Sequence, residues 1–274
     1  MTDRADIIVL SDLHVDFIEG YQTLDDFIDE ISARRPRLLV AAGDLGHGRH
    51  FERALEVLNA IPADQRAVVV GNHDLWCHCK FWHSACTSEK LFREIHPKVA
   101  ADLGWAWLEN VTLRVGDAAI VGSVGWYDYS ACDQPGASTE QIRSVKARYN
   151  NDGNYMDASW DDLRVAEDCR AGLAQRLEVI EKDPSISRSI VVTHLPILRE
   201  QRVAASGDEP ISNAYFLNYT IGHEVMKFPK VTEIVSGHTH RAMDSMVDRP
   251  GLSPVRARVV GADYGRPTFV EVTV

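Results

Sequence analysis

The tetrapeptide Gly71-Asn72-His73-Asp74 directly follows an apolar run, Ala-Val-Val-Val, at residues 67–70. A short β-branched run of this kind predicts a buried strand. The strand would then be followed by an amide, an imidazole and a carboxylate within three positions. Because ligands of open α/β sheets bind beyond the carboxyl ends of the strands, this stretch predicts a functional site.

Four further apolar runs are each followed within a few residues by aspartate or histidine. They are residues 7–10 before Asp12 and His14, 38–41 before Asp44, 190–192 before His194, and 233–235 before His238 and His240. Carboxylates neutralise cations and imidazoles bind borderline metals, so these side chains predict a metal site. Asp44, with two carboxylate oxygens, is the natural bridge between two ions, and Asn72 offers a neutral oxygen. The mixed nitrogen and oxygen ligands favour Mn, Fe or Zn over Mg alone.

The order of the remaining patterns predicts an α/β fold with a largely parallel sheet. Leu24, Phe27, Ile28 and Ile31 repeat at helical spacing, which predicts an amphipathic helix over 23–34. Strand and helix patterns then alternate with short connections, as in right-handed crossovers. Further helices are expected at 49–61, 89–102 and 159–182.

Later segments have a different pattern. Runs at 107–115 and 118–124 flank Gly116-Asp117 and predict an antiparallel hairpin, and the runs at 256–261 and 268–273 also resemble antiparallel strands. Residues 127–157 are polar and rich in Gly, Pro, Asn and Tyr, which predicts a long surface excursion that could serve as a lid. Since no internal repeat or linker is evident, we expect one domain spanning 1–274.

Composition restricts the classes of partner. The formal net charge of -11 and the pI near 5.4 argue against a long, sequence-independent grip on nucleic acid. No apolar run approaches the roughly 20 residues of a membrane helix, so no membrane partner is expected. The five cysteines are scattered, and no N-terminal signal pattern is evident, so we expect a reduced, cytoplasmic protein.

Taken together, the motifs resemble those of a known family. Asp12-x-His14, Gly43-Asp44, Gly71-Asn72-His73-Asp74, His194 and Gly237-His238-x-His240 are similar to the five motif blocks of the calcineurin-like metallophosphoesterases, in the same order. The resemblance implies an α/β fold of four α-β-β-α layers, with two mixed β-sheets flanked by helices and a dinuclear metal site at the C-terminal edge of the strands.

The resemblance also implies a role for each matching residue. By position, one metal ion would be held by Asp12, His14, Asp44 and His240. The other would be held by Asp44, Asn72, His194 and His238. His73 would lie beside the phosphate and assist the leaving oxygen, and Asp74 would hold His73 in orientation.

The reaction expected from this resemblance is hydrolysis of a phosphodiester or a small organic phosphate by a metal-bound hydroxide. Gly43-Asp44 is not followed by Arg-Gly, and Asp74 stands where Gly-Asn-His-Glu would have glutamate, which argues against the Ser/Thr protein phosphatase branch. His47, three residues after Asp44, resembles a phosphate-contacting histidine of the nuclease branch. A nuclease and a metal-binding scaffold without turnover therefore remain alternatives, although a scaffold would not need His73.

A second metal site is a weaker possibility near residue 80. Cys77, Cys79, His83 and Cys86 offer the thiolate and imidazole ligands of structural zinc sites. Cys77 and Cys79 are separated by one residue, however, whereas zinc motifs usually have two to four. The alternative is a partly buried loop with ordinary thiols.

Overall fold

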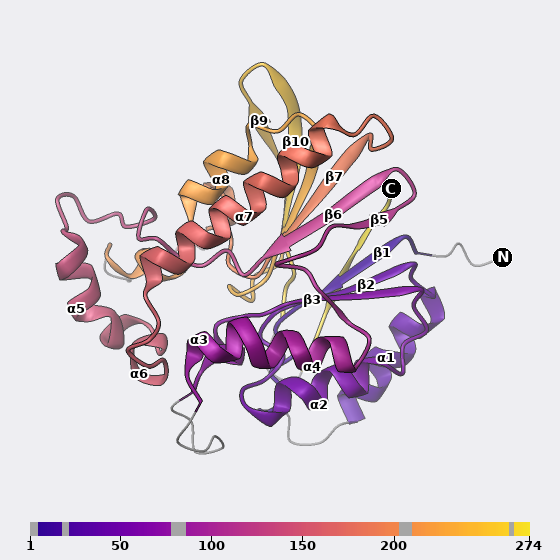
Figure 1. Ribbon diagram of the computed structural model, residues 1–274, viewed down its shortest axis with the longest axis horizontal. Helices are drawn as coiled ribbons and strands as arrows, with labels where there is room; N and C mark the ends of the chain where they lie inside the picture. The colour runs from indigo at the N-terminus through magenta and orange to yellow at the C-terminus, as the bar shows by residue number, and fades with distance from the viewer. Residues whose placement is uncertain (1–4, 18–21, 78–85, 203–209, 263–265) are drawn as a thin grey trace.

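A computed structural model of the chain describes residues 5–17, 22–77, 86–202, 210–262 and 266–274. Two β-sheets face each other at its centre (Figure 1). The first sheet has the strand order β11 (Phe269–Val272), β1 (Ile7–Leu10), β2 (Leu38–Ala42), β3 (Gln65–Val69) and β4 (Ala106–Trp107). The second has the order β5 (Leu113–Val115), β6 (Ala118–Ser123), β7 (Arg188–Thr193), β8 (Val231–Ser236), β10 (Leu252–Val259) and β9 (Met243–Arg249).

Both sheets are mixed, with a parallel centre. Strands β1 to β4 pair in parallel, and β11 adds to β1 in the antiparallel direction. In the second sheet β6, β7, β8 and β10 are parallel, while the edge strands β5 and β9 are antiparallel to their neighbours. The parallel strands therefore direct their carboxyl ends to a common edge.

Helices cover the outer faces of the two sheets. On the first sheet lie α1 (Gln22–Arg34), α2 (Arg49–Leu58) and α4 (His96–Asp102), and on the second lie α7 (Asp162–Lys182) and α8 (Tyr219–Val225) (Figure 1). The short helix α3 (Ser88–Lys90) and the π-helical stretch η2 (Leu91–Ile95) lead directly into α4. Two mixed sheets flanked by helices confirm the fold class expected from the sequence. Among the described residues, no helix has both the length and the apolar character needed to cross a membrane.

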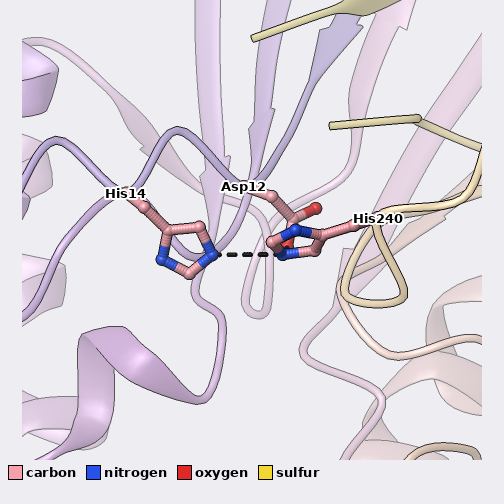
Figure 2. A group of neighbouring side chains, drawn as sticks. All are labelled: Asp12, His14 and His240. Carbon is pink, nitrogen blue, oxygen red and sulfur yellow. Dashed lines mark hydrogen bonds and ion pairs between the residues drawn. The ribbon is translucent and has the colours of Figure 1, made fainter. Parts of the chain in front are cut away.

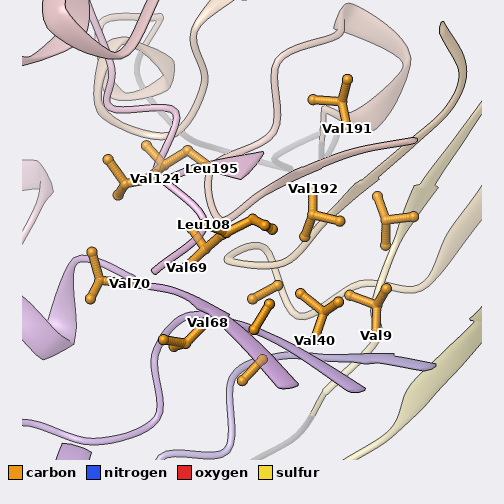
Figure 3. Close-up of a cluster of buried hydrophobic side chains, with 14 of the residues drawn as sticks. Val9, Val40, Val68, Val69, Val70, Leu108, Val124, Val191, Val192 and Leu195 are labelled. Atoms are coloured by element: carbon orange, nitrogen blue, oxygen red, sulfur yellow. The ribbon is translucent and has the colours of Figure 1, made fainter. Parts of the chain in front are cut away.

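The core lies between the sheets and is built mainly from branched aliphatic side chains. Val9, Val40 and Val69 come from the first sheet and Val192 from the second (Figure 3). Gly122 in β6 is needed for this contact. A Cβ at this position would lie 2.6 Å from Cδ2 of Leu108 and 2.9 Å from Cγ2 of Val69, closer than real Cβ atoms approach their neighbours.

Residues 127–157 are more ordered than the surface excursion expected from their polarity. They contain α5 (Thr139–Tyr149) and α6 (Asp152–Tyr155), and α5 begins with a capping box formed by Ser138 and Gln141. Only Ile142 of α5 is buried, which explains the weak periodicity. The flanking residues Tyr127 and Asp152, in contrast, are fully buried.

The C-terminal strands also differ from the expectation. The hairpin of β5 and β6 is confirmed, but the runs at 256–261 and 268–273 contribute to different sheets. β11 pairs antiparallel with β1, as expected, whereas β10 is antiparallel to β9 and parallel to β8. Strand β9 was not predicted because it is an edge strand with a largely exposed surface, so its sequence lacks an apolar run.

A buried histidine connects α4 to the Gly71–Asp74 loop. Nε2 of His96 donates a hydrogen bond to the backbone oxygen of Asp74 at 2.8 Å, and its ring packs on Phe51 with centroids 4.1 Å apart. Nδ1 is buried without a hydrogen-bond partner among the described residues. Burial lowers the pKa of His96 to about 4.

We expect this buried histidine to make the folded state sensitive to acid. Above about pH 6.5 His96 is neutral in both states, whereas below that pH the unfolded chain binds a proton that the folded chain resists. A folded pKa of about 4 corresponds to a loss of about 2 kcal/mol between pH 7 and pH 5. Urea unfolding at these two pH values should show this loss in the wild type and a smaller loss in His96→Gln. Equal losses in both proteins would exclude His96 as the cause.

Candidate active site

All seven expected metal ligands lie just beyond the carboxyl ends of five parallel strands. They are Asp12 and His14 after β1, Asp44 after β2, Asn72 after β3, His194 after β7, and His238 and His240 after β8. Hydrogen bonds between the loops hold these ends together. The backbone N–H of Asp12 donates to the oxygen of Gly43 at 2.9 Å, and that of Gly237 donates to the oxygen of His194 at 3.0 Å. Nδ1 of His194 donates to the backbone oxygen of Ala42 at 2.9 Å, and the backbone N–H of His238 donates to Oδ2 of Asp12 at 2.9 Å, so the site joins the two sheets at their common edge.

The first group of ligands consists of Asp12, His14 and His240 (Figure 2). Nε2 of His14 and Nε2 of His240 are 3.2 Å apart, and Nε2 of His240 is 3.3 Å from Oδ1 of Asp12. Asp12 and His14 are buried, whereas His240 is partly exposed. The group is therefore open to solvent on the His240 side.

The second group consists of Asp44, His194 and His238, with Asn72 beside it. Nε2 of His194 is 3.4 Å from Oδ1 of Asp44 and 3.2 Å from Oδ1 of Asn72. The other oxygen of Asp44, Oδ2, lies 3.7 Å from Nε2 of His14 in the first group. Asp44 thus directs one carboxylate oxygen to each group, which is the geometry required of a bridging ligand.

The donor atoms fit a pair of cations. Two ligands at right angles on a cation with bonds of about 2.1 Å are about 3 Å apart, close to the separations within both groups. Nδ1 of His194 donates a hydrogen bond to the backbone oxygen of Ala42 at 2.9 Å, which leaves Nε2 for a metal ion. Nε2 of His238 is buried without a hydrogen-bond partner among the described residues, as expected of an atom meant for coordination.

Five of these seven residues have a left-handed backbone. The φ angles are 57° for Asp12, 43° for His14, 52° for Asp44, 69° for His238 and 58° for His240. Non-glycine residues seldom adopt this conformation, and where they do so they cluster at functional sites. The turns after the strands therefore direct the side chains inward at a cost in backbone energy.

Neighbouring glycines allow the loops to approach closely. A Cβ at Gly43 would lie 2.5 Å from the backbone nitrogen of Gly71 and 2.6 Å from Nδ1 of His194. A Cβ at Gly237 would overlap Oγ of Ser11 and lie 2.6 Å from Oδ2 of Asp12. Both positions require glycine because neighbouring atoms occupy the space of a side chain.

The buried carboxylates attract positive charge. Burial opposes ionisation of Asp44, but His194 and His73 outweigh it and hold the pKa of this carboxyl well below its usual range. Burial likewise disfavours the charged form of His194, yet Asp44 raises its pKa to about 9. For His238 burial dominates and lowers the pKa to about 3. Bound cations would provide the positive charge that the carboxylates require and would compete with protons for the imidazoles.

His73 lies beside the bridging Asp44 and, together with Asp44 and His14, forms a further group of side chains that could hold a metal ion. Its backbone N–H donates to Oδ1 of Asp44 at 2.9 Å, and its Nε2 lies 3.9 Å from Oδ2 of Asp44. The ring stacks on Trp76 with centroids 3.7 Å apart. Burial lowers the pKa of His73 to about 4. The imidazole therefore faces the metal groups in its neutral form.

Asp74 has different partners from those expected. Its Oδ1 accepts hydrogen bonds from the backbone N–H groups of Leu45 at 2.9 Å and Gly46 at 3.0 Å, and its Oδ2 accepts one from Gly71 at 2.8 Å. The carboxylate thus ties the Asp44 loop to the Asn72 loop. The expectation that Asp74 orients the ring of His73 is corrected by these contacts, because both of its oxygens bind loop backbone.

His47 lies outside the two ligand groups. Its Nδ1 is 2.5 Å from Oδ2 of the buried Asp16, and its ring centroid lies 6.4 Å from that of Trp76. Among the described residues, it does not border the cavity at the metal groups. Its contacts place it behind Trp76, beside the β1 loop.

Of the four residues considered for a second metal site near residue 80, the structure describes Cys77 and Cys86. Cys79 and His83 lie outside the described residues. Sγ of Cys77 lies 2.9 Å from Oδ2 of Asp157, and burial raises the pKa of this thiol to about 11. Within the described part of the chain, neither Cys77 nor Cys86 belongs to a group that could hold a metal ion.

A cavity of about 430 Å³ opens beside the second ligand group. Asp44, Asn72 and His73 border it on the metal side. The opposite walls contain residues that the sequence did not single out: Tyr149, Asn150, Asn151, Asn213, Phe216 and Arg241. No sequence signal identified them, because they come from the end of α5, the short turn at Ser212–Tyr215 and nearby loops, which only the fold brings to the site.

The family model of the calcineurin-like phosphoesterases matches residues 5–242, and the chain belongs to this family. It is therefore a hydrolase of phosphate esters; members of the family depend on a dinuclear metal centre, and this chain carries candidate ligand groups for one. Comparison with curated protein sequences gives no significant match.

Solved structures show the same fold. A phosphopantetheinyl hydrolase from Mycobacterium tuberculosis has a TM-score of 0.73 at 18% identity, with 97% of this chain and 92% of that chain covered. A dimetal phosphatase from Danio rerio has a TM-score of 0.52 at 14% identity, covering 94% and 88%. At these identities the likeness extends to the fold alone.

We expect Gly237→Ala to disturb the first ligand group. The added methyl would overlap Ser11 and press on Asp12, so the ligand would move and the protein would lose at least one metal ion per chain. Elemental analysis of Mn²⁺-loaded protein after gel filtration measures this loss.

Gly172→Ala provides the matched control. A Cβ at Gly172, within α7, would have no neighbouring atom within 4 Å, so alanine should leave metal content unchanged and stabilise the helix by about 0.5–1 kcal/mol. Full metal content in Gly237→Ala would contradict the close-approach argument.

Proposed function

We propose that the enzyme hydrolyses a phosphodiester or a small organic phosphate at this site. Asp12, His14, Asp44 and His240 would hold one metal ion, and Asp44, Asn72, His194 and His238 the other. The observation that supports this assignment is the position of Asp44, whose two oxygens lie 3.7 Å from His14 and 3.4 Å from His194. We propose that Mn, Fe or Zn occupies these positions, and that residues 1–274 form one domain.

Bound cations would supply Lewis acidity, which lowers the pKa of a water and neutralises charge on the phosphate. The chain's own residues would position the metal ions and the ester and would exclude bulk water from the site. The loops around Asp12 and Asp44 hold the ligands in a buried edge, and the cavity beside them admits the ester. Burial also strengthens every interaction with a charged phosphate, since the local dielectric is low.

His73 would act as the catalytic group that assists the leaving oxygen. A neutral imidazole can donate a hydrogen bond to an ester oxygen, and a nearby phosphate charge would raise its pKa toward that of a proton donor. Its stacking on Trp76 restricts the plane of the ring. Asp74 would support this role indirectly, by holding the loops that carry Asp44 and His73.

The size and lining of the cavity favour a small substrate. Its amides and aromatic rings can bind a polar organic group attached to the phosphate. The net charge of -11 disfavours long nucleic acid. A nuclease remains the second candidate. His47 is held by Asp16 and lies beside Trp76, where it could contact a longer substrate.

We also propose a cytoplasmic location. Among the described cysteines, Cys77, Cys132 and Cys169 are free thiols, which suits a reducing compartment.

Metal removal tests the proposed chemistry. Protein treated with a chelator should be inactive toward bis-p-nitrophenyl phosphate, because the carboxylates and imidazoles by themselves cannot activate water. Addition of Mn²⁺ should restore turnover, measured by release of p-nitrophenol. Undiminished activity in metal-free protein would refute the proposal.

Replacement of His73 tests its role separately. His73→Ala should keep its metal content and lower turnover by roughly 10²-fold or more, the scale of proton-transfer catalysis. His223→Ala, at an exposed position of α8, is the matched control and should retain full turnover. A His73→Ala protein that lost its metal would show that His73 is a ligand instead.

A substrate panel separates the two candidate functions. Metal-loaded protein would be given a phosphomonoester, small linear and cyclic diesters, a phosphopantetheinyl ester and single-stranded DNA. The phosphopantetheinyl ester is included because the fold neighbour from Mycobacterium tuberculosis is a phosphopantetheinyl hydrolase. Higher kcat/KM for a small ester than for DNA supports the proposal, and the reverse supports the nuclease.

A further inference from the structure

We infer that Asp152 is a positioning residue of the metal site, whose carboxylate holds the amide of Asn72 so that the amide oxygen faces the second metal position. The inference rests on the proposed role of Asn72 as a ligand. It concerns a residue of α6, far from every motif in the sequence, that the fold brings to the Asn72 loop.

Asp152 is a buried carboxylate whose two oxygens both accept hydrogen bonds. Its Oδ1 accepts hydrogen bonds from Nδ2 of Asn72 and from Nε1 of Trp76, both at 2.8 Å. Its Oδ2 accepts one from the hydroxyl of Tyr127 at 3.0 Å. Only 1% of the residue is exposed, so these three donors take the place of water.

The chemistry of the two side chains fixes the direction of the amide. An ionised carboxylate can only accept hydrogen bonds, so the NH₂ group of Asn72 must face Asp152. The amide oxygen then points the other way, where it lies 3.2 Å from Nε2 of His194. If the amide rotated by half a turn, its NH₂ group would face the metal position and could not bind a cation.

The same carboxylate also fixes the residue behind His73. The indole of Trp76 is held by its bond to Asp152 and lies between the rings of His73, at 3.7 Å, and Tyr155, at 4.6 Å. One oxygen atom of Asp152 therefore constrains both a proposed ligand and the support of the proposed catalytic histidine. Partners around metal ligands typically change metal affinity 10- to 100-fold when removed.

A purely structural explanation is that Asp152 anchors α6 to the β3 loop. The backbone N–H of Cys77 donates a hydrogen bond to the backbone oxygen of Tyr155 in α6 at 3.1 Å, so α6 has a second anchor that does not involve the carboxylate. The two explanations differ in metal binding, because an anchor alone would not determine which atom of Asn72 faces the cation.

The test compares Mn²⁺ binding by isothermal titration calorimetry, together with the electron paramagnetic resonance signal of a coupled manganese pair. The wild type should bind two Mn²⁺ ions. Asp152→Ala should bind the second ion 10- to 100-fold more weakly and lose the coupled signal. Asp152→Asn should remain close to the wild type, since its amide oxygen can still accept from Asn72 and Trp76 while its NH₂ group faces Tyr127.

Tyr127→Phe is the matched control. It removes the partner of Oδ2 but leaves the bond to Asn72, so it should bind both ions as the wild type does. Should Asp152→Ala not fold, Asp152→Ser replaces it, because a hydroxyl one bond from Cβ does not reach Asn72.

A double variant separates orientation from simple stability. In Asp152→Ala combined with Asn72→Asp, the aspartate presents an oxygen in either orientation, so binding of the second ion should recover. Failure of this recovery, or full binding in Asp152→Ala alone, would overturn the inference while leaving the proposed function intact. A wild type that bound fewer than two ions would instead refute the proposed metal site.

Discussion

The site depends on two carboxylates, Asp12 and Asp44, that are buried at the edge where the two sheets meet. Burying like charges close together is unfavourable unless opposite charge is supplied. The surrounding imidazoles can supply that positive charge, as the raised pKa of His194 shows. The remaining features of the site, including the donor separations near 3 Å and the bridging position of Asp44, follow from the same requirement.

The fold meets this requirement through unfavourable backbone conformations. Asp12, His14 and Asp44 adopt left-handed φ angles directly after strands whose side chains are fully buried. The hydrogen bonds between loops and the three backbone bonds accepted by Asp74 hold these turns in place. The surrounding sheets and hydrogen bonds therefore offset the cost of the strained turns. Residues with such conformations persist at functional sites for this reason.

The segment between β6 and α7 contributes more than a cover for the site. Its helix α5 is mostly exposed, yet Tyr127, Asn150 and Asp152 are buried, and Asp152 accepts hydrogen bonds from Asn72 and Trp76 of the β3 loop. The segment borders the cavity and also reaches the amide of Asn72, so it contacts both the cavity and a proposed metal ligand.

The sequence by itself determined the parallel strands, the helices that cross between them and the seven candidate ligands. These features are local: apolar runs form buried strands, and polar side chains at their carboxyl ends lie at one edge. The sequence did not identify β9, α5 or Asp152, since exposed elements have weak periodicity and Asp152 is one polar residue among many. The direction of the Asp74 carboxylate was likewise decided only by the tertiary structure. Adjacent residues can point to different partners, and the partner of a buried polar group is chosen by whichever donors the packed chain brings within hydrogen-bond distance.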